Sequence, residues 1–254
     1  MSIASEITRL QNAKAALKSS IEAKGVTVDP SATLDSYPEL VDSIPTGGRE
    51  YEPICFTSLE DGNTFQLNRK IAISVDGKQT WQTLNANANS PVINTGEKIY
   101  FKATDDATAN AGTINQYYKF TTAKTCNVSG HPYSLYAKGS LYFFANLFNG
   151  TKIVDASGLD LSEDIKTTYC YSGMFNNCTS LVTAPSELSS TTTASYCYSN
   201  MFGGCTSLTT APELPAIRLA DYCYSNMFYN CSSLTTTPSL PATTLATYCY
   251  QGMF

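Results

Sequence analysis

Charged side chains are scarce in this chain: Asp, Glu, Lys and Arg make up 15% of its 254 residues, and the net charge is −5. Nucleic-acid binding needs clustered Lys and Arg to meet the phosphates, so this composition argues against a nucleic-acid partner. No apolar run approaches the ~18 residues of a membrane span, and the N-terminus lacks the basic start and apolar core of a signal peptide. We therefore expect a protein without a membrane span that is made in the cytoplasm of its host cell.

Residue types suited to catalysis are also few. His131 is the only histidine, so a Ser-His-Asp or Cys-His triad would depend on it alone, and Gly130-His131-Pro132 is typical of a junction loop. Phosphate-binding loops and the GxGxxG and HExxH motifs are absent. Adjacent carboxylates such as Glu60-Asp61 lie in turn-like segments, whereas glycosidases hold two carboxylates across a cleft. The sequence predicts no enzyme and no catalytic, cofactor-binding or metal-binding residue, and it leaves the ligand-binding residues unknown.

The first segment, residues 1–48, contains a heptad pattern that predicts a helix. Its seam positions follow one another in steps of 4 and 3 residues: Ile3, Ile7, Leu10, Lys14, Leu17 and Ile21. Gly25 is a stop signal, a second short helix is expected to extend to about Ile44, and residues 45–48 form a linker. Two short helices bury little by themselves, which favours self-association or docking on another protein over an isolated helical hairpin. We expect a helical anchor that forms a homo-oligomer or binds a partner.

Residues 49–138 are expected to form a small all-β domain. Short runs rich in β-branched and aromatic residues are separated by turn residues. These runs are 54–57, 64–67, 71–73, 81–84, 98–101 and 117–120. Asp76-Gly77 accepts the positive φ angles of a tight turn, so it predicts a hairpin between two of the runs. Their number and spacing favour an Ig-like sandwich, with Trp81 in its core.

From about residue 139 onward the chain repeats itself. The motif Tyr-Cys-Tyr-x-x-Met-Phe begins at Tyr169, Tyr196, Tyr222 and Tyr248, and its cysteines are 27, 26 and 26 residues apart. A degenerate earlier copy places Leu147-Phe148 at the Met-Phe positions and Val154 at the position of Leu181. Repeats of this length are typical of a solenoid, whose units bury their faces against their neighbours. We expect residues 139–254 to be a solenoid with units of about 26 residues.

Each unit is expected to contain a short helix over the Tyr-Cys-Tyr motif and a short strand after it. Leucines at equivalent places are expected to point inward from that strand: Leu181, Leu208 and Leu234. Gly and Asn replace each other at two positions of the motif, which indicates positive φ there. The first position holds Gly173, Asn200, Asn226 and Gly252, and the second holds Asn177, Gly204 and Asn230.

Seven of the nine cysteines fall into two columns of the repeats. The first column is Cys170, Cys197, Cys223 and Cys249, and the second is Cys178, Cys205 and Cys231. Free cysteine is among the most buried residue types, so we interpret both columns as core packing. A disulfide ladder is an alternative, although a chain without a signal peptide meets no oxidising compartment. Zinc is disfavoured because the tightly spaced cysteine pairs of zinc motifs are missing.

The surface of the repeats must be nearly free of charge. Between residues 169 and 254 the charged side chains are Glu187, Glu213, Arg218 and Asp221. A face of Thr, Ser, Asn and Tyr can bind a glycan or a protein through hydroxyl groups and aromatic rings, with little dependence on salt. The alternative is that Thr and Ser are merely solvated strand formers. We expect one tyrosine of each pair flanking a first-column cysteine to be exposed.

The repeats resemble the BspA-like leucine-rich repeat family, which occurs in surface proteins of gut bacteria and in their phages. The stretch from Met201 to Tyr224 matches the pattern throughout, including Ala211-Pro212 and Leu219-Ala220, whereas the first unit lacks the second proline. Residues 3–44 are similar to the short helical starts of many tailed-phage virion proteins. These resemblances imply adhesion or display by leucine-rich repeats, and an anchoring role on a particle.

The sequence therefore predicts a phage virion structural protein, either a fibre or a decoration protein of head or tail. Its repeats would serve host attachment through glycans or surface proteins, and its N-terminal helices would bind other virion proteins. The alternative is a bacterial cell-surface adhesin with the same repeats. Because residues 253 and 254 fall within a unit, we expect either a longer native chain or another chain that covers the open end.

Overall fold

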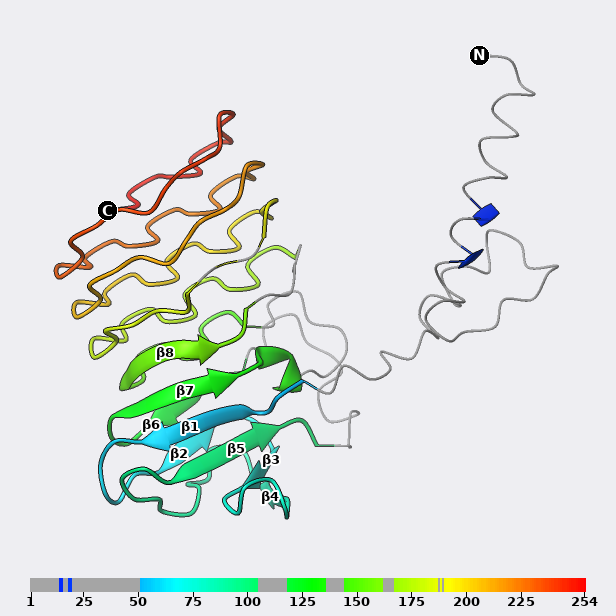
Figure 1. The fold of residues 1–254 in the computed structure, drawn as a ribbon, viewed down its shortest axis with the longest axis vertical. Helices are drawn as coiled ribbons and strands as arrows, with labels where there is room; N and C mark the ends of the chain where they lie inside the picture. Colours follow the sequence, from blue (N-terminus) through cyan, green and yellow to red (C-terminus); the bar gives the residue numbers. More distant parts are fainter. Residues whose placement is uncertain are drawn as a thin grey trace. The chain divides into compact units, whose positions relative to one another are not determined.

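The computed structural model describes residues 14–15, 18–19, 51–104, 118–135, 144–161, 167–186, 188 and 190–254. The chain divides into two compact units, Met1–Glu50 and Tyr51–Phe254. The second unit contains a pair of sheets followed by stacked repeats (Figure 1). The predicted boundary between residues 138 and 139 lies outside the described residues.

Two sheets form the first part of the second unit. The larger has the strand order β4-β3-β5-β1-β7-β8, and the smaller pairs β2 with β6. The elements are β1 Ile54–Ser58, β2 Phe65–Leu67, β3 Ile71–Ser74, β4 Gln82–Leu84, β5 Lys98–Lys102, β6 Phe120–Thr122, β7 Cys126–Gly130, the 3-10 helix η3 Pro132–Leu135, and β8 Ile153–Leu159. The strand pairs are antiparallel except for β7 and β8, which run parallel.

Phenylalanine side chains hold the two sheets together. The ring centroid of Phe56 in β1 lies 4.9 Å from that of Phe65 in β2 and 5.0 Å from that of Phe120 in β6. All three rings are fully buried. Buried and less buried residues alternate along β2 and β6, as the two-residue period of a strand requires, so one face of this small sheet supplies the core.

The predicted strands agree with β1 to β5, whereas the run predicted at 117–120 overlaps β6 only at Phe120. The hairpin at Asp76-Gly77 is confirmed, because β3 and β4 pair antiparallel. Gly77 and Lys78 both have a φ of 75°. Asp76 Oδ1 accepts a hydrogen bond of 3.0 Å from the N–H of Thr80, so its side chain closes a loop longer than two residues.

The prediction of Trp81 in the core is wrong. Trp81 directly precedes β4, the edge strand of the larger sheet, and its side chain is only half-buried. Lys102 Nζ lies 4.2 Å from the centroid of the tryptophan ring, a cation–π contact at the surface. β4 buries Leu84 and exposes its other two side chains, so this edge has no second layer to enclose an indole.

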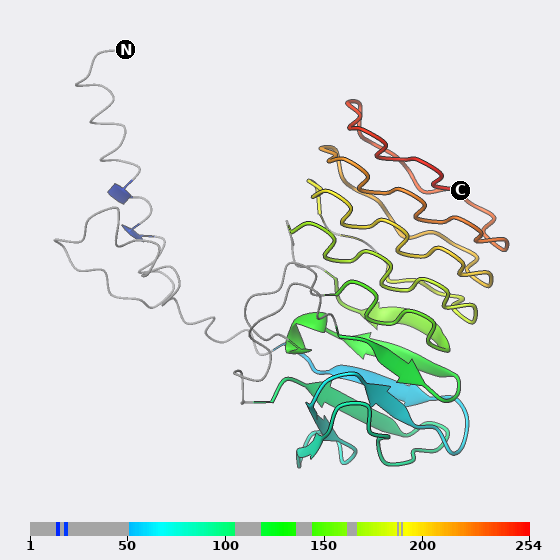
Figure 2. The ribbon, with the colours of Figure 1, turned by 180° about the vertical axis from the view of Figure 1, so that it is seen from behind.

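Stacked units continue the larger sheet from its β8 edge (Figures 1 and 2). Isolated parallel bridges join equivalent residues of successive units: Asp155 in β8 to Thr183, Thr183 to Thr210, and Thr210 to Thr236. Another parallel bridge joins Thr192 to Arg218. Each unit therefore hydrogen-bonds to the next in register, and one apolar cluster runs from the sheets into the repeats.

The Tyr-Cys-Tyr motifs are runs of turns and not the short helices that we expected. In the first unit positive φ recurs at every fourth residue: Tyr169, Gly173 and Asn177. The N–H of Gly173 donates to Ser199 of the next unit, at 2.9 Å, whereas the N–H of Met174 donates three residues back, at 3.1 Å. An α-helix needs negative φ throughout and bonds to the fourth residue back. The left-handed residues break that pattern and leave every second N–H for the neighbouring unit.

The predicted fold class is wrong. The elements of the described residues are strands and one 3-10 helix, with no α-helix among them, which conflicts with an N-terminal α-helical anchor. From residues 1–48 the structure describes only Lys14, Ala15, Lys18 and Ser19; their backbone is helical but they define no helix. The sheets, with six and two strands and a parallel pair, differ from an Ig-like sandwich. The repeats consist of turns and isolated bridges, which does not establish a leucine-rich-repeat solenoid.

Candidate binding surface

Equivalent aromatic residues of successive units stack into three columns. The phenylalanine column is Phe148, Phe175, Phe202, Phe228 and Phe254, with centroids 5.3 to 5.8 Å apart. The inner tyrosine column is Tyr171, Tyr198, Tyr224 and Tyr250, with centroids 5.5 to 5.8 Å apart. The outer tyrosine column is Tyr169, Tyr196, Tyr222 and Tyr248, with centroids 4.6 to 5.0 Å apart. The first two columns are buried up to Phe228 and Tyr224, whereas Tyr250 is half-buried and Phe254 is exposed; the third column lies at the surface.

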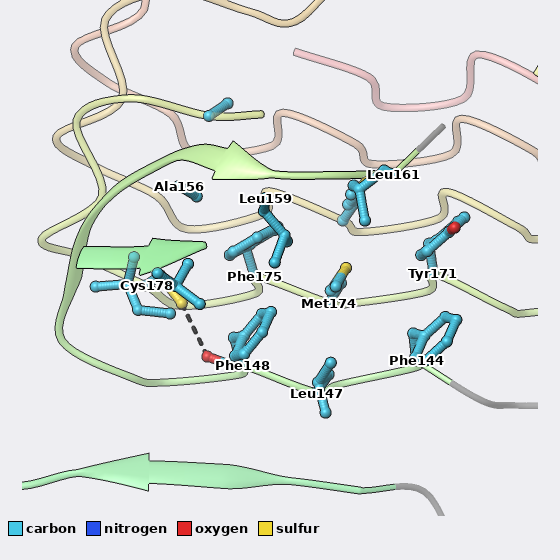
Figure 3. Packing of buried hydrophobic residues seen from close by; sticks show 14 of the residues in the cluster. Phe144, Leu147, Phe148, Ala156, Leu159, Leu161, Tyr171, Met174, Phe175 and Cys178 are labelled. Carbon is cyan, nitrogen blue, oxygen red and sulfur yellow. Dashed lines mark hydrogen bonds between the residues drawn. The ribbon is translucent and has the colours of Figure 1, made fainter. Parts of the chain in front are cut away.

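The degenerate copy before Tyr169 belongs to the same stack. Phe148 packs on Phe175, and its N–H donates to Met174 at 2.9 Å, so Leu147-Phe148 occupy the Met-Phe positions as predicted (Figure 3). The prediction for Val154 is wrong by one residue. The bridge between Asp155 and Thr183 places Ile153, not Val154, beside Leu181, and both Ile153 and Leu181 are fully buried.

The cysteine columns are packed free thiols, as predicted. All nine cysteines are free, and eight of them are buried. Second-column thiols donate to phenylalanine carbonyls of the preceding unit: Cys178 to Phe148 at 2.9 Å (Figure 3), Cys205 to Phe175 at 3.1 Å and Cys231 to Phe202 at 3.1 Å. Burial raises the pKa of Cys178 to about 11, so this thiol stays protonated at neutral pH. The disulfide ladder is therefore excluded in this structure.

The outer tyrosine column places bulky residues in a backbone conformation that they rarely adopt. Its φ angles are 63°, 58°, 57° and 53° from Tyr169 to Tyr248. For a residue with a Cβ, the left-handed region costs about 1–2 kcal/mol. The other left-handed positions of the motif hold only Gly or Asn, which adopt this region more readily, and the prediction of positive φ there is confirmed. Tyrosine is therefore retained at the first position in spite of a backbone cost.

Backbone bonds on both sides hold Tyr169, Tyr196 and Tyr222 in place. The N–H of Tyr196 donates to Asp221 of the next unit at 3.1 Å, and its carbonyl accepts from Ser199 at 3.2 Å. The corresponding N–H of Tyr222 donates to Thr247 at 2.9 Å. Because these backbone hydrogen bonds repeat from unit to unit, the tyrosine rings are held at a regular spacing.

Burial differs between the two tyrosines of each pair, but the outer one is half-buried, and not exposed as we expected, except at Tyr248. Tyr198 and Tyr224 of the inner column are 2% and 1% exposed, whereas Tyr196 and Tyr222 of the outer column are half-buried. Partial burial, together with the neighbouring phenols and Asp221, raises the pKa of Tyr196. The hydroxyl of Tyr196 is therefore protonated at neutral pH and can donate a hydrogen bond.

The rest of the repeat surface is polar but almost uncharged. Exposed threonines, with one valine, form two neighbouring columns: Val182, Thr209 and Thr235, and Thr183, Thr210 and Thr236. Among the described residues from Tyr169 to Phe254 the charged ones are Glu213, Arg218 and Asp221, and all three are exposed. A partner of this face must therefore be recognised through hydroxyl groups, amides and aromatic rings, with little contribution from ion pairs.

His131 lies in a buried position and not in an open junction loop. Its side chain is 4% exposed, and its ring centroid is 4.4 Å from that of Tyr51. Nδ1 accepts a hydrogen bond of 3.1 Å from the N–H of Tyr133, just where η3 begins. These contacts give the imidazole a packing role between β7 and η3.

The described residues contain neither a metal-binding cluster nor a membrane-spanning helix. Among them, no group of three or more His, Cys, Asp or Glu side chains could hold a metal ion. Within the same residues no helix is long and apolar enough to cross a membrane. The outer tyrosine column is therefore the candidate site that we consider further.

Comparisons with known proteins add no relative. No protein-family model matches the chain, and neither the curated proteins nor the solved structures contain a significant match. The resemblance to BspA-like repeats and to virion proteins thus stays a prediction from sequence.

Sequence reasoning missed the left-handed tyrosines, although the pattern contains a signal for them. The Gly and Asn positions within a motif are four residues apart, as Gly173 and Asn177 are. The residue four positions before Gly173 is Tyr169, so the same period predicts positive φ there. A tyrosine hides this periodicity because it is not a residue that indicates positive φ.

Proposed function

We propose that this chain is a structural protein of a phage virion that presents its repeats for attachment to the host surface. The observation that carries the proposal is the outer tyrosine column, stacked from unit to unit at the surface of repeats that have few charged residues. A repeated rigid surface can make many weak contacts at once, which multiplies affinity without any single deep pocket.

Three further features support this function. All nine thiols are free, which suits a protein assembled in a reducing cytoplasm. The hydrophobic cluster is continuous from the sheets into the repeats, so the surface is rigid and loses little entropy on binding. Residues 3–44 resemble, in sequence, the short helical starts of tailed-phage virion proteins, and the repeats resemble BspA-like repeats, which occur in surface proteins of gut bacteria and in their phages.

Particle composition tests the virion part of the proposal. Quantitative mass spectrometry of purified particles should find the chain at a fixed ratio to the major capsid protein. The same measurement on uninfected cells should find none of it. Recovery from the membrane fraction of uninfected cells would instead establish the alternative, a bacterial cell-surface adhesin.

Competition tests the attachment part. The purified full chain, added before the particles, should reduce phage adsorption to host cells in a dose-dependent way. A heat-unfolded sample of the same chain serves as the control. Undiminished adsorption at saturating amounts of the folded chain would contradict an attachment role.

A further inference from the structure

We propose that the outer tyrosine column is the contact site of this surface for a neutral, linear polysaccharide that lies along the column. The inference rests on the proposed attachment function and assigns its site and ligand class. Four observations support it: the ring edges and hydroxyl groups that the column exposes, the distance between the rings, the charge near the column, and the use of tyrosine at a left-handed position.

Stacking determines which parts of the rings can meet a partner. The planes of Tyr169 and Tyr196 are 15° apart and those of Tyr196 and Tyr222 are 5° apart, so neighbouring rings cover each other's faces. Ring edges and hydroxyl groups are what the column can offer. Aromatic edges carry the positive part of the quadrupole, and phenols donate hydrogen bonds. A partner rich in oxygen acceptors fits this surface better than an apolar one, which would need open ring faces.

The distance between successive rings can be compared with the distance between successive residues of a polymeric ligand. Successive centroids are 4.6, 4.6 and 5.0 Å apart. An extended peptide advances by about 3.2–3.4 Å per residue, so it would fall out of register along the column. A linear polysaccharide whose sugar rings all face the same way presents equivalent hydroxyl groups once per sugar ring, a step longer than that of a peptide residue.

The charges near the column favour a neutral chain over an acidic one. Asp221 immediately precedes Tyr222 and is close enough to Tyr196 to affect its hydroxyl electrostatically. The carboxylate of Asp221 accepts a hydrogen bond from Thr247 N–H at 3.0 Å, which holds this negative charge in place. This fixed negative charge disfavours an acidic polysaccharide at the column.

The backbone gives an independent reason to assign a function to these side chains. Where the motif requires a left-handed residue for geometry alone, it uses Gly or Asn, as at Gly173 and Asn200. At the first position it uses tyrosine in all four motifs, with φ between 53° and 63°. Strained residues that persist in this way are concentrated at functional sites.

Two double variants of the full chain test the inference. Y196N/Y222N removes rings and hydroxyls while keeping a residue that tolerates positive φ, and Y196F/Y222F keeps the stack and removes only the hydroxyls. Tyr229 is 60% exposed and lies outside the column, so Y229F is the matched control. The probes are immobilised neutral glucan, mannan and galactan, with one carboxylated and one sulphated polysaccharide for comparison, alongside whole host cells.

The expected result is that the wild type binds at least one neutral polysaccharide, and that Y196N/Y222N weakens this binding at least about tenfold. Y196F/Y222F should weaken it by about threefold or more, with an unchanged melting temperature, and Y229F should leave it unchanged. Because the phenylalanine variant retains the stack, it stays informative if the asparagine variant fails to fold.

Several results would overturn the inference. The first is that the wild type and both double variants bind the polysaccharides with equal affinity. The second is that the wild type binds the acidic polysaccharides more tightly than the neutral ones. The third is that binding to host cells disappears when the surface proteins of the cells are digested. Loss of a self-association by the variants, without any polysaccharide binding, would show that the column joins two copies of the chain. In these cases the attachment function can still hold. If the wild type binds neither polysaccharides nor host cells, the proposed function fails as well.

Discussion

Tyr196 and Tyr222 stack with ring centroids 4.6 Å apart and planes within 5° of parallel, although both residues have left-handed backbone conformations. The backbone cost of about 1–2 kcal/mol per residue and the stacking gain of about 0.5–1.5 kcal/mol per pair are of similar size. Stability by itself therefore gives little reason for tyrosine at this position. This balance is the basis of the first prediction.

Replacing Tyr196 by Asn should lower the free energy of unfolding by less than about 2 kcal/mol, because the lost stacking on Tyr169 and Tyr222 is partly offset by relief of the left-handed tyrosine. Replacing Tyr198 by Ala is the contrast. Tyr198 is 2% exposed and stacks on both sides, so its truncation should cost about 3–5 kcal/mol. Chemical denaturation of the full chain measures both values. Equal losses for the two variants would show that the outer column is as structural as the inner one.

Replacing Gly204 by Ala should destabilise the chain more than replacing Gly77 by Ala. Both glycines have a φ of 75°, so each alanine carries a cost of about 1–2 kcal/mol for the left-handed backbone. At Gly204 the new Cβ would also lie 2.6 Å from Asn177 Oδ1 of the preceding unit, whereas at Gly77 no atom lies within 4 Å. The difference between their unfolding free energies measures how closely the units approach. No difference would contradict the stacking described for this part of the motif.

Replacing Phe202 by Ala should cost about 3–5 kcal/mol, because this fully buried ring stacks on Phe175 at 5.4 Å and on Phe228 at 5.7 Å. The control is Tyr229→Ala, which removes a side chain that is 60% exposed and should stay within about 0.5 kcal/mol of wild type. Denaturant titration followed by circular dichroism gives both values. A small effect at Phe202 would mean that the phenylalanine column is not continuous.

Stability should fall as the pH rises above about 9. Burial raises the pKa of Cys178 from its ordinary value of 9.0 to about 11 in the folded chain. Between these values the folded state holds a proton that the unfolded state has released, so the stabilisation present below pH 9 is lost as the pH approaches 11. Denaturation midpoints between pH 8 and 11 should decline for wild type and decline less for Cys178→Ala. A flat profile for wild type would argue against buried thiols.

The sequence allowed the strands of residues 54–101, the turn at Asp76 and the cysteine columns to be predicted, because each depends on a local pattern. Alternating apolar residues indicate a strand wherever they occur, and an exact repeat indicates stacked side chains without any knowledge of the backbone.

The remaining features depend on contacts that a local pattern does not contain. The helix predicted for the Tyr-Cys-Tyr motif was wrong because Tyr169 has positive φ, stabilised by a hydrogen bond to Ser195 in the next unit. The placement of Val154 was wrong because a bridge between Asp155 and Thr183 determines the register of β8. Trp81 was expected in the core because a single tryptophan is usually buried, but its strand lies at the edge of the sheet.

The most direct test of the central claim is the salt dependence of binding by the full chain to host cells. If attachment uses hydroxyl groups and ring edges on an uncharged surface, the dissociation constant should change by less than about twofold between about 0.05 M and 0.5 M NaCl, since screening acts only on charges. A loss of affinity of about tenfold or more over this range would contradict the account, because binding would then depend on ion pairs.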